Sequence, residues 1–313
     1  MKTGMVEATP IPAPARVLLT GATGFLGRHV LEELLRKGYR VRCLVRSPQK
    51  LPSGVAATPI VGDITQQEAV SRAAAGCQAA IHLVGIILQS RYARYDDIHR
   101  LGAQNVVRAC ASQAVRRLVH LSALGARADA PSAYLRSKWD GEQEVRNSSL
   151  AYTILRPSVI HGPGGALAQL LVRLARFPFL MPLPGSAEGL LQPVLAQDVA
   201  RLAVQALSLP HTAGQTYDVA GPSLCTLEEL LQAVSAVING RHRRTLRIPL
   251  PLLMMVAGLL ERLLRHPPFT REQLGLLSEV NVCSLGPLFR DFAFKPQPLD
   301  ESLRSYLPMP PKT

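Results

Sequence analysis

Three glycines spaced three residues apart constrain this chain more than any other feature, in the segment Gly21-Ala-Thr-Gly24-Phe-Leu-Gly27. The apolar run at 16–20 is typical of a buried parallel strand, and residues 29–37 have a helical pattern that ends at Gly38. In such a unit one glycine permits the tight turn, another lets the backbone approach a pyrophosphate, and the third lets the helix pack on the sheet. The helix N-terminus attracts the phosphates. The pattern predicts a dinucleotide site at Gly21, Thr23, Gly24, Phe25, Leu26 and Gly27.

After the glycines, short apolar strands alternate with helical patterns. Strands are predicted at 39–45, 55–61, 79–84, 118–122, 152–155 and 216–219, and helices at 67–75, 96–113, 137–146, 167–176 and 199–207, the last with Asp198 as its N-cap. This alternation predicts an α/β fold, a Rossmann doubly wound parallel sheet with a smaller, mostly helical C-terminal lobe. We expect a flexible lead-in at 1–15, a dinucleotide-binding domain at 16–222 with a loop and helix excursion at 161–192, and a substrate-side lobe at 223–313.

The residue after the second strand decides which nucleotide is preferred, because an Asp or Glu there selects NAD. This chain has Arg46 at that place and no acidic residue between Glu33 and Asp63. A guanidinium suits a 2′-phosphate, so the sequence favours NADP(H) and leaves NAD(H) as the alternative. Arg46 could instead stack on the adenine. Asp63 is placed either to meet the adenine edge or to act as an ordinary turn residue.

A phenol and an ammonium lie four residues apart in Tyr134-Leu-Arg-Ser-Lys138, on one face of a predicted helix, and Ser122 ends the strand before it. A phenol can exchange a proton with a carbonyl or alcohol, but it needs a nearby cation to ionise at neutral pH. A charge at about 4 Å could lower the phenol pKa by up to roughly three units. We therefore predict Ser122, Tyr134 and Lys138 as the catalytic set; an exposed helix where Tyr and Lys meet by chance is the alternative.

The amino-acid composition argues against two classes of binding partner, metal ions and nucleic acids. The five cysteines are scattered without metal-ligand spacing, which argues for a reducing compartment and against a metal site. The net charge of +13 raises the question of nucleic acid, but the arginines are dispersed and aromatic residues make up only 5%, too few for base stacking, so we expect no nucleic-acid binding. With neither a signal peptide nor a transit peptide recognised, the expected location is cytoplasmic, or peripheral at the inner face of the membrane.

The C-terminal part contains a strongly apolar segment at 252–264, preceded by a basic cluster at 241–244. A helix of this length would span about 20 Å, short of the roughly 30 Å bilayer core, so it cannot cross a membrane. It could be a buried helix that covers the substrate pocket. It could also be a surface that meets a membrane or a lipophilic ligand, with Arg243, Arg244 and Arg247 at headgroup level.

Together these residues resemble an atypical short-chain dehydrogenase/reductase of the extended kind. The resemblance is carried by Thr20–Gly27, Gly62-Asp63, Leu121–Gly125, Tyr134 with Lys138 and Gly141-Glu142, and Leu155–Ser158. More narrowly, Gln192–Val194, Asp198–Ala200, Pro268–Leu274 and Leu276–Val282 resemble bacterial relatives of the nucleotide-binding accessory (thirty-nine-kilodalton) subunit of respiratory complex I.

This resemblance implies bound NADPH and links to quinone and respiratory metabolism. By position it implies that Leu83, Val84 and Gly85 form the adenosine-side wall, that Lys138 also holds the nicotinamide ribose, and that the nicotinamide is lined by Pro157, Ser158 and Val159. There are departures: the family's active-site asparagine falls near His99, and the catalytic serine could align with Ala123 instead of Ser122.

Two functions remain open at this point. One is an oxidoreductase or epimerase-like enzyme with Tyr134 as acid/base and a hydrophobic, quinone-like substrate. The other is a non-catalytic, NADPH-holding structural or assembly factor that contacts the respiratory complex. In both, the expected partner is a nicotinamide dinucleotide.

Overall fold

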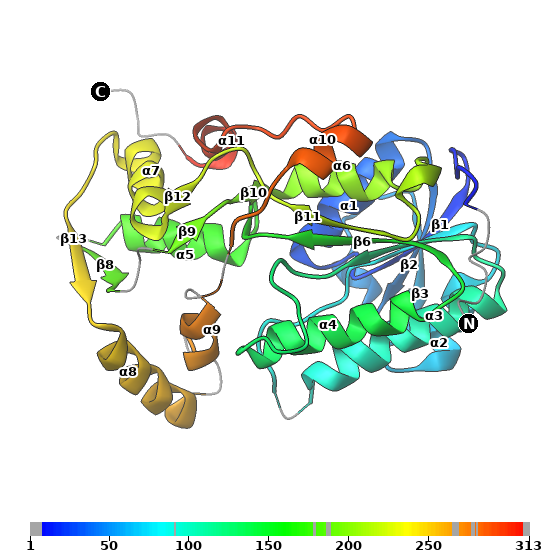
Figure 1. Ribbon diagram of the computed structural model, residues 1–313, viewed down its shortest axis with the longest axis horizontal. Helices are drawn as coiled ribbons and strands as arrows, with labels where there is room; N and C mark the ends of the chain where they lie inside the picture. The colour runs from blue at the N-terminus through cyan, green and yellow to red at the C-terminus, as the bar shows by residue number, and fades with distance from the viewer. Residues whose placement is uncertain are drawn as a thin grey trace. The chain divides into compact units, whose positions relative to one another are not determined.

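A parallel sheet of seven strands organises the chain in the computed structural model, which describes residues 8–90, 92–177, 180–185, 189–264, 269–276, 279 and 281–308 (Figure 1). The strand order is β11-β6-β5-β4-β1-β2-β3. The strands are β1 (Arg16–Thr20), β2 (Arg40–Val45), β3 (Ala57–Val61), β4 (Ala79–His82), β5 (Arg117–Leu121), β6 (Ala151–Pro157) and β11 (Gln215–Val219). Every pair of neighbouring strands is parallel, which confirms the predicted Rossmann fold.

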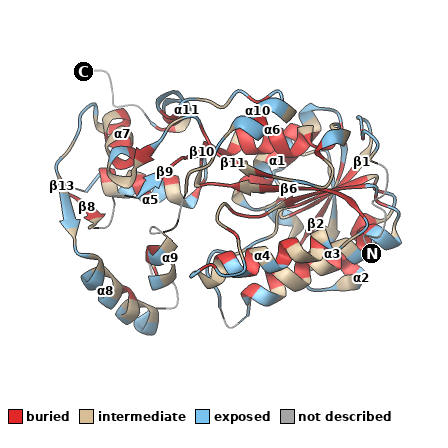
Figure 2. Ribbon diagram, in the orientation of Figure 1, coloured by how far each residue is buried: buried red, intermediate tan, exposed pale blue. Residues whose placement is uncertain are grey.

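Helices cover both faces of this sheet. On one face lie α1 (Phe25–Arg36) and α6 (Ala196–Gln205); on the other lie α2 (Gln67–Ala74), α3 (Gly102–Ser112) and α4 (Ala133–Arg146) (Figure 1). The strands and the inward helix faces are buried, as expected for a parallel sheet covered on both sides (Figure 2). The short helix α10 (Gly286–Asp291) returns to this unit late in the chain, where Asp291 accepts a hydrogen bond from the Tyr217 hydroxyl of β11 at 2.8 Å.

The second compact unit is formed by the described residues of 158–195, 220–283 and 296–308. Three two-stranded ladders contribute to it: β7 (Ile160–His161) with β10 (Val194–Leu195), β8 (Met181–Pro184) with β13 (Thr245–Ile248), and β9 (Leu190–Leu191) with β12 (Cys225–Thr226). Its helices are α5 (Ala166–Ala175), α7 (Leu227–Asn239), α8 (Leu250–Leu263), α9 (Arg271–Leu276) and α11 (Leu299–Tyr306). Leucines of α5, α7 and α11 form its core, including Leu171, Leu230 and Leu303.

The predicted starts of α4 and α6 were wrong, whereas the start predicted at residue 96 agrees with the structure. Helix α4 starts at Ala133 instead of 137, because Ser132 caps it by accepting a hydrogen bond from the Leu135 amide. Helix α6 starts at Ala196, so Asp198 is not its N-cap; it lies in the first turn, where its carboxylate pairs with Arg201 at 3.0 Å. The predicted helix at 96–113 begins as a π-helical turn, η2 (Asp96–Leu101).

Within the described residues, no helix combines the length and the apolar character that a bilayer crossing requires. The predicted apolar helix at 252–264 is present as α8, but Ala257 is its single buried residue.

A buried arginine links several elements at the edge of the sheet where β5 and β6 begin. Arg117 of β5 donates to the carbonyl of Ala151 at the start of β6 and to the carbonyl of Ala206 just after α6, at 3.0 and 3.1 Å. Its other nitrogen donates to the hydroxyls of Thr153 and Thr212. Burial lowers the pKa of this guanidinium to about 10, which leaves it charged at neutral pH. The arginine therefore acts as a hydrogen-bonding centre that satisfies four neutral acceptors from three segments: β6, the residue after α6, and the turn that contains Thr212.

We predict that Arg117→Met lowers the free energy of unfolding by roughly 3 kcal/mol or more, because each buried acceptor left without a donor costs about 1–3 kcal/mol. Chemical denaturation followed by circular dichroism measures the change. The matched control is Arg116→Met, since Arg116 is the exposed neighbour and should change stability little. Equal losses of stability in the two variants would contradict the role of Arg117 as a hydrogen-bonding centre.

Candidate functional site

The carboxyl ends of the parallel strands gather most of the predicted site residues at one edge of the sheet. The glycine turn follows β1, Arg46 follows β2, Asp63 comes two residues after β3, Leu83 to Gly85 follow β4, and Ser122 follows β5. Strands β1 and β4 are neighbours, and the chain leaves them in opposite directions along the sheet. In open α/β sheets this switch point is where ligands bind.

Two of the three glycines, Gly21 and Gly27, leave no room for a side chain. Gly21 has φ +80°, in the left-handed region, and a Cβ there would lie 3.1 Å from the Val84 amide nitrogen. A Cβ at Gly27 would lie 1.9 Å from the Gly21 carbonyl oxygen, which is an impossible contact. The turn, the loop after β4 and the start of α1 therefore pack at backbone distance, with Leu83 and Val84 against Gly21; their place in an adenosine-side wall stays a prediction.

The N-terminus of α1 offers backbone donors without a competing side chain. Gly24 is its N-cap, with extended backbone and no side-chain cap, and the first turn contains no acidic residue. The hydrogen bond from the Arg28 amide to the Gly24 carbonyl, at 3.2 Å, closes the first turn of the helix. The amides of Phe25, Leu26 and Gly27 precede it and carry the partial positive charge of the helix end. This cradle fits a pyrophosphate.

Arg46 and Asp63 lie together at the ends of β2 and β3. The Arg46 Nε is 4.0 Å from the Asp63 carboxylate, and the arginine side chain is largely exposed. Asp63 Oδ1 also accepts from the Thr65 amide and hydroxyl, at 3.0 and 2.8 Å, so it closes a turn. An exposed guanidinium beside one turn carboxylate is free to reorient toward a phosphate.

Tyr134 and Lys138 project from the first turns of α4. Lys138 is buried, and its Nζ donates to the Leu121 carbonyl at 2.6 Å, at the end of β5 directly before Ser122. A Cβ at Gly85 would lie 3.6 Å from this Nζ, so the loop after β4 reaches the lysine. The structure thus brings together Lys138, Gly85 and the end of β5.

The pKa of Tyr134 shifts in the direction opposite to the one predicted. Burial raises the pKa of the Tyr134 phenol to about 12. Burial also lowers the pKa of Lys138 to about 8, partly offset by Glu142. The Lys138 ammonium donates its hydrogen bond to the Leu121 carbonyl, and the Tyr134 ring packs against the rings of Tyr95 and His99. Loss of water around the phenol therefore raises its pKa more than the nearby ammonium lowers it. The site holds a phenol that stays protonated at neutral pH.

His99 is a site residue whose role the sequence analysis did not identify. Its Nε2 accepts from the Ile86 amide at 3.0 Å, and its Nδ1 is 2.7 Å from Ser137 Oγ, which itself donates to the Tyr134 carbonyl. The imidazole is therefore neutral with its proton on Nδ1, and burial lowers its pKa to about 2. Its ring stacks on Tyr95 at 5.4 Å and meets Tyr134 edge-on at 5.7 Å. It lies in the π-helical turn η2, a feature often found at functional sites.

Ser122 lies behind this edge with two buried histidines. Its hydroxyl, His82 Nε2 and both ring nitrogens of His120 have no hydrogen-bond partner within the described part of the chain. His82 Nδ1 is 2.7 Å from the Thr20 hydroxyl, and burial lowers the pKa of His82 to about 3, so it is neutral. These polar atoms make the interior under the site a place where water or a ligand group would gain hydrogen bonds.

The last predicted residues are divided between the units. Pro157 ends β6 in the first unit, whereas Ser158 and Val159 belong to the second. There Ser158 Oγ donates to the Asn281 carbonyl at 3.0 Å, and the Val159 carbonyl accepts from the Val194 amide. Their contact with a nicotinamide stays a prediction.

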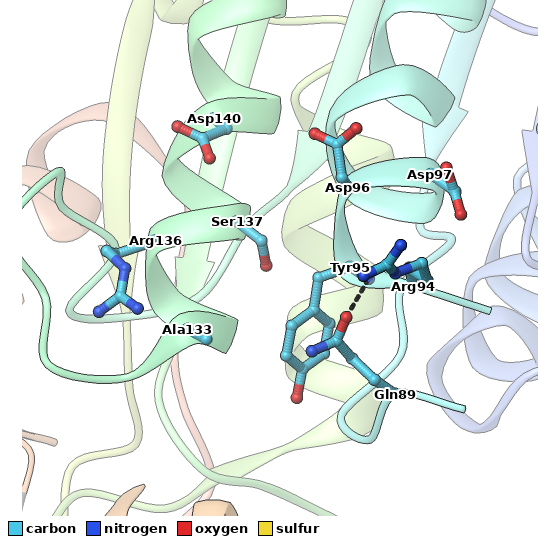
Figure 3. Close-up of a pocket in the computed structure, with 9 residues that line it drawn as sticks. All are labelled: Gln89, Arg94, Tyr95, Asp96, Asp97, Ala133, Arg136, Ser137 and Asp140. Carbon is cyan, nitrogen blue, oxygen red and sulfur yellow. Dashed lines mark hydrogen bonds between the residues drawn. The ribbon is translucent and has the colours of Figure 1, made fainter. Parts of the chain in front are cut away.

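A polar pocket of about 470 Å³ opens beside α4 and η2 (Figure 3). Side chains of both signs surround it, and the Gln89 amide oxygen accepts from the Tyr95 amide at its wall. Ser137, which holds His99, lies between the two helices that form it. The lining residues are Gln89, Arg94, Tyr95, Asp96, Asp97, Ala133, Arg136, Ser137 and Asp140. Among the described residues no cluster of His, Cys, Asp and Glu could hold a metal ion.

Comparison with known proteins places the site in context. A family model described as NAD(P)H-binding matches residues 21–210. The mitochondrial NADH dehydrogenase (ubiquinone) 1 alpha subcomplex subunit 9 of Arabidopsis thaliana is 27% identical, over 90% of this chain and 72% of that protein. The 2-alkyl-3-oxoalkanoate reductase of Stenotrophomonas maltophilia is 30% identical, over 92% of this chain and 97% of that protein. These similarities confirm the resemblance predicted from the motifs.

A solved structure has the same fold as this chain. The NADPH-dependent quinone oxidoreductase QOR2 of Escherichia coli, in complex with NADPH, superposes with a TM-score of 0.74 at 20% identity, over 92% of this chain and 99% of that one.

We predict that Gly24→Asp leaves the fold intact but weakens NADPH binding more than about 100-fold. Aspartate is a favourable N-cap, so α1 should persist, while its carboxylate would repel a pyrophosphate bound at the same amides. Thermal denaturation and fluorescence titration with NADPH separate the two effects. Gly275→Asp, on an exposed position with open space around it, is the control. Undiminished binding by the Gly24 variant would rule out this cradle as the pyrophosphate site.

Proposed function

Since the chain belongs to the NAD(P)H-binding family, we propose that it is an NADP(H)-dependent reductase of a hydrophobic carbonyl or quinone-like compound. The observation that carries the proposal is the partly buried Tyr134 side chain, four residues before Lys138 on α4 and in edge contact with the His99 ring. The rest of the site supports a dinucleotide at the adjacent edge of the sheet.

The preference for NADP(H) is supported by the end of β2. Arg46 offers an exposed guanidinium, and the acidic residue nearest to it is Asp63, already committed to a turn through Thr65. A 2′-phosphate could replace that long 4.0 Å contact with charge-assisted hydrogen bonds to the guanidinium. Leu83 to Gly85, after β4, would form the adenosine-side wall.

The protonation states support the reductive direction. A bound reduced dinucleotide supplies hydride. The Tyr134 phenol, protonated at neutral pH because its pKa is raised to about 12, is suited to donate a proton to the carbonyl oxygen. Carbonyl, hydride and proton together give the alcohol, and with a pKa near 8 Lys138 can return a proton to the site. Ser122 Oγ, which has no hydrogen-bond partner among the described residues, would orient the carbonyl.

The substrate class is supported by the chemistry named for a relative. The reductase that is 30% identical acts, by its name, on a 2-alkyl-3-oxoalkanoate, which carries a ketone between alkyl chains. A quinone is likewise a carbonyl compound, and the relative from the respiratory enzyme carries ubiquinone in its name. A hydrophobic ketone or quinone is therefore the class to test first.

A non-catalytic, NADPH-holding factor of the respiratory chain is the second candidate. It is favoured by the same burial, because a lysine whose pKa has fallen to about 8 and which is bound to the Leu121 carbonyl does little to activate Tyr134. Contact with a respiratory complex would rest on the similarity to the Arabidopsis subunit. In this case bound dinucleotide stabilises the fold and no turnover follows.

We predict that Arg46→Ala weakens NADPH binding about 10- to 100-fold and leaves NADH binding unchanged, since the lost hydrogen bonds to a charged phosphate contribute about 1.5–3 kcal/mol. Parallel calorimetric titrations measure the dissociation constants of the variant for NADPH and for NADH. Arg40→Ala, at the opposite end of β2, should bind both as the unmodified protein does. An equal loss for NADPH and NADH would show that Arg46 covers the adenine and does not select the phosphate.

We predict that Tyr134→Phe retains NADPH binding but lowers turnover at least about 100-fold, the usual contribution of a positioned general acid. NADPH oxidation is followed with decylubiquinone and with a long-chain 3-oxo ester as probes. Tyr92→Phe, at an exposed position, is the control. If neither probe is reduced by the unmodified protein, and Tyr134→Phe supports respiratory growth while Gly24→Asp does not, the holding function replaces the enzymatic one.

A further inference from the structure

The second unit exposes an apolar stripe along α8. Leu252, Met255, Leu259 and Leu263 are 45%, 67%, 57% and 70% exposed. Their spacing of three, four and four residues places them on one side of the helix, along about 16 Å of its length. Ala257 is the residue that α8 buries, and it points away from the stripe. The exposed side therefore does not belong to the core of this unit.

The flanks of the stripe are basic. Arg241, Arg244 and Arg247 precede α8 and are exposed, as is Arg262 in its last turn. The nearest acidic residues are engaged: Glu228 binds Arg247 at 2.8 Å, and Glu261 binds Arg271 at 3.0 Å from the side of α8 opposite the stripe. Leu246 of β13, between the arginines, is also exposed. Within the described residues, no ion pair is seen for Arg241 and Arg244 before this apolar stripe or for Arg262 at its end, so positive charge flanks it on both sides.

We propose that this surface, defined as the α8 stripe with Arg241, Arg244 and Arg262, docks on an anionic lipid bilayer. An amphipathic helix of this kind lies in the plane of the interface, with its apolar side buried about 5–10 Å and its arginines among the headgroups. Fourteen residues are too few to span the bilayer, so the helix lies on the membrane and does not cross it.

Charge complementarity selects this occupant over another protein. Excess positive charge at the ends of a short leucine-rich stripe matches a negative surface, and the whole chain carries a net charge of +13. A second copy of the chain would place these arginines against one another or against equally basic surface. The proposal does not depend on whether the dinucleotide site performs turnover.

Vesicle flotation with the full chain tests the proposal. We expect binding to phosphatidylcholine vesicles that contain phosphatidylglycerol, weaker binding in high salt, and little binding to phosphatidylcholine alone. Arg241→Glu with Arg244→Glu should lower the partition coefficient at least about 25-fold, about fivefold for each basic residue at roughly 1 kcal/mol apiece. Met255→Glu with Leu259→Glu should abolish binding even in low salt.

Two control variants accompany these. Leu224→Glu replaces an exposed leucine of the same unit outside the stripe, and Arg108→Glu reverses an exposed charge on α3; both should bind as the unmodified protein does. The absence of flotation, or flotation unaffected by the α8 variants, would overturn the proposal. So would a dimer in analytical ultracentrifugation that the Leu259→Glu substitution dissociates while lipid binding is absent.

Insertion depth gives a second, independent readout. Trp139 is the chain's single tryptophan and lies on α4 in the first unit. In Leu259→Trp the added indole should shift its emission to the blue on anionic vesicles and be quenched by brominated acyl chains, whereas the emission of the unmodified protein should not change. An indole that stays in water while the protein floats would place the contact elsewhere and contradict the proposal.

Discussion

The close approach of Gly27 to the Gly21 carbonyl is the contact on which the site depends. A side chain at Gly27 would overlap that oxygen at 1.9 Å, so the first turn of α1 can rest on the glycine turn only without one. This contact directs the amides of residues 25–27 toward the switch point between β1 and β4. Gly21 in turn packs on the backbone of Leu83 and Val84, which carries the loop after β4 to Lys138. The proposed phosphate cradle and the loop that reaches Lys138 are thus held by one set of backbone contacts.

Burial, more than ion pairing, sets the chemistry at the carboxyl edge of the sheet. Desolvation raises the pKa of Tyr134 to about 12 and lowers those of Lys138, His82 and His99 to about 8, 3 and 2. Each shift favours the neutral form. The hydrogen bond from the Ile86 amide to His99, and that of His99 to Ser137, are compatible with the neutral imidazole alone. At neutral pH the site therefore holds neutral imidazoles and a protonated phenol beside the Lys138 ammonium, which stays mostly charged because its pKa of about 8 is still above 7.

The sheet and the glycine turn could be predicted because their signals are local: an apolar run, a glycine spacing and a helix period within a few residues. The π-helical turn that carries His99 could not, since its placement depends on Gly141, where a Cβ would lie 2.6 Å from the His99 carbonyl. The strand β8 was missed because Pro182 and Pro184 disfavour it and its partner β13 lies some sixty residues later in the chain. The pKa of Tyr134 was predicted with the wrong sign because spacing along a helix shows which groups are neighbours but not how far water is excluded from them.

The glycine turn alone does not distinguish an enzyme from a dinucleotide holder, because binding stabilises the folded state in both, by an amount that grows with the logarithm of free ligand over Kd. The distinction lies in groups that binding does not need. Dinucleotide binding does not need the Tyr134 phenol, which contacts the rings of Tyr95 and His99, nor the buried polar atoms of Ser122 and His120, which have no hydrogen-bond partner among the described residues. The proposed reduction uses the phenol as proton donor, so the two proposed functions differ in their need for this group and not for the glycine turn that both of them share.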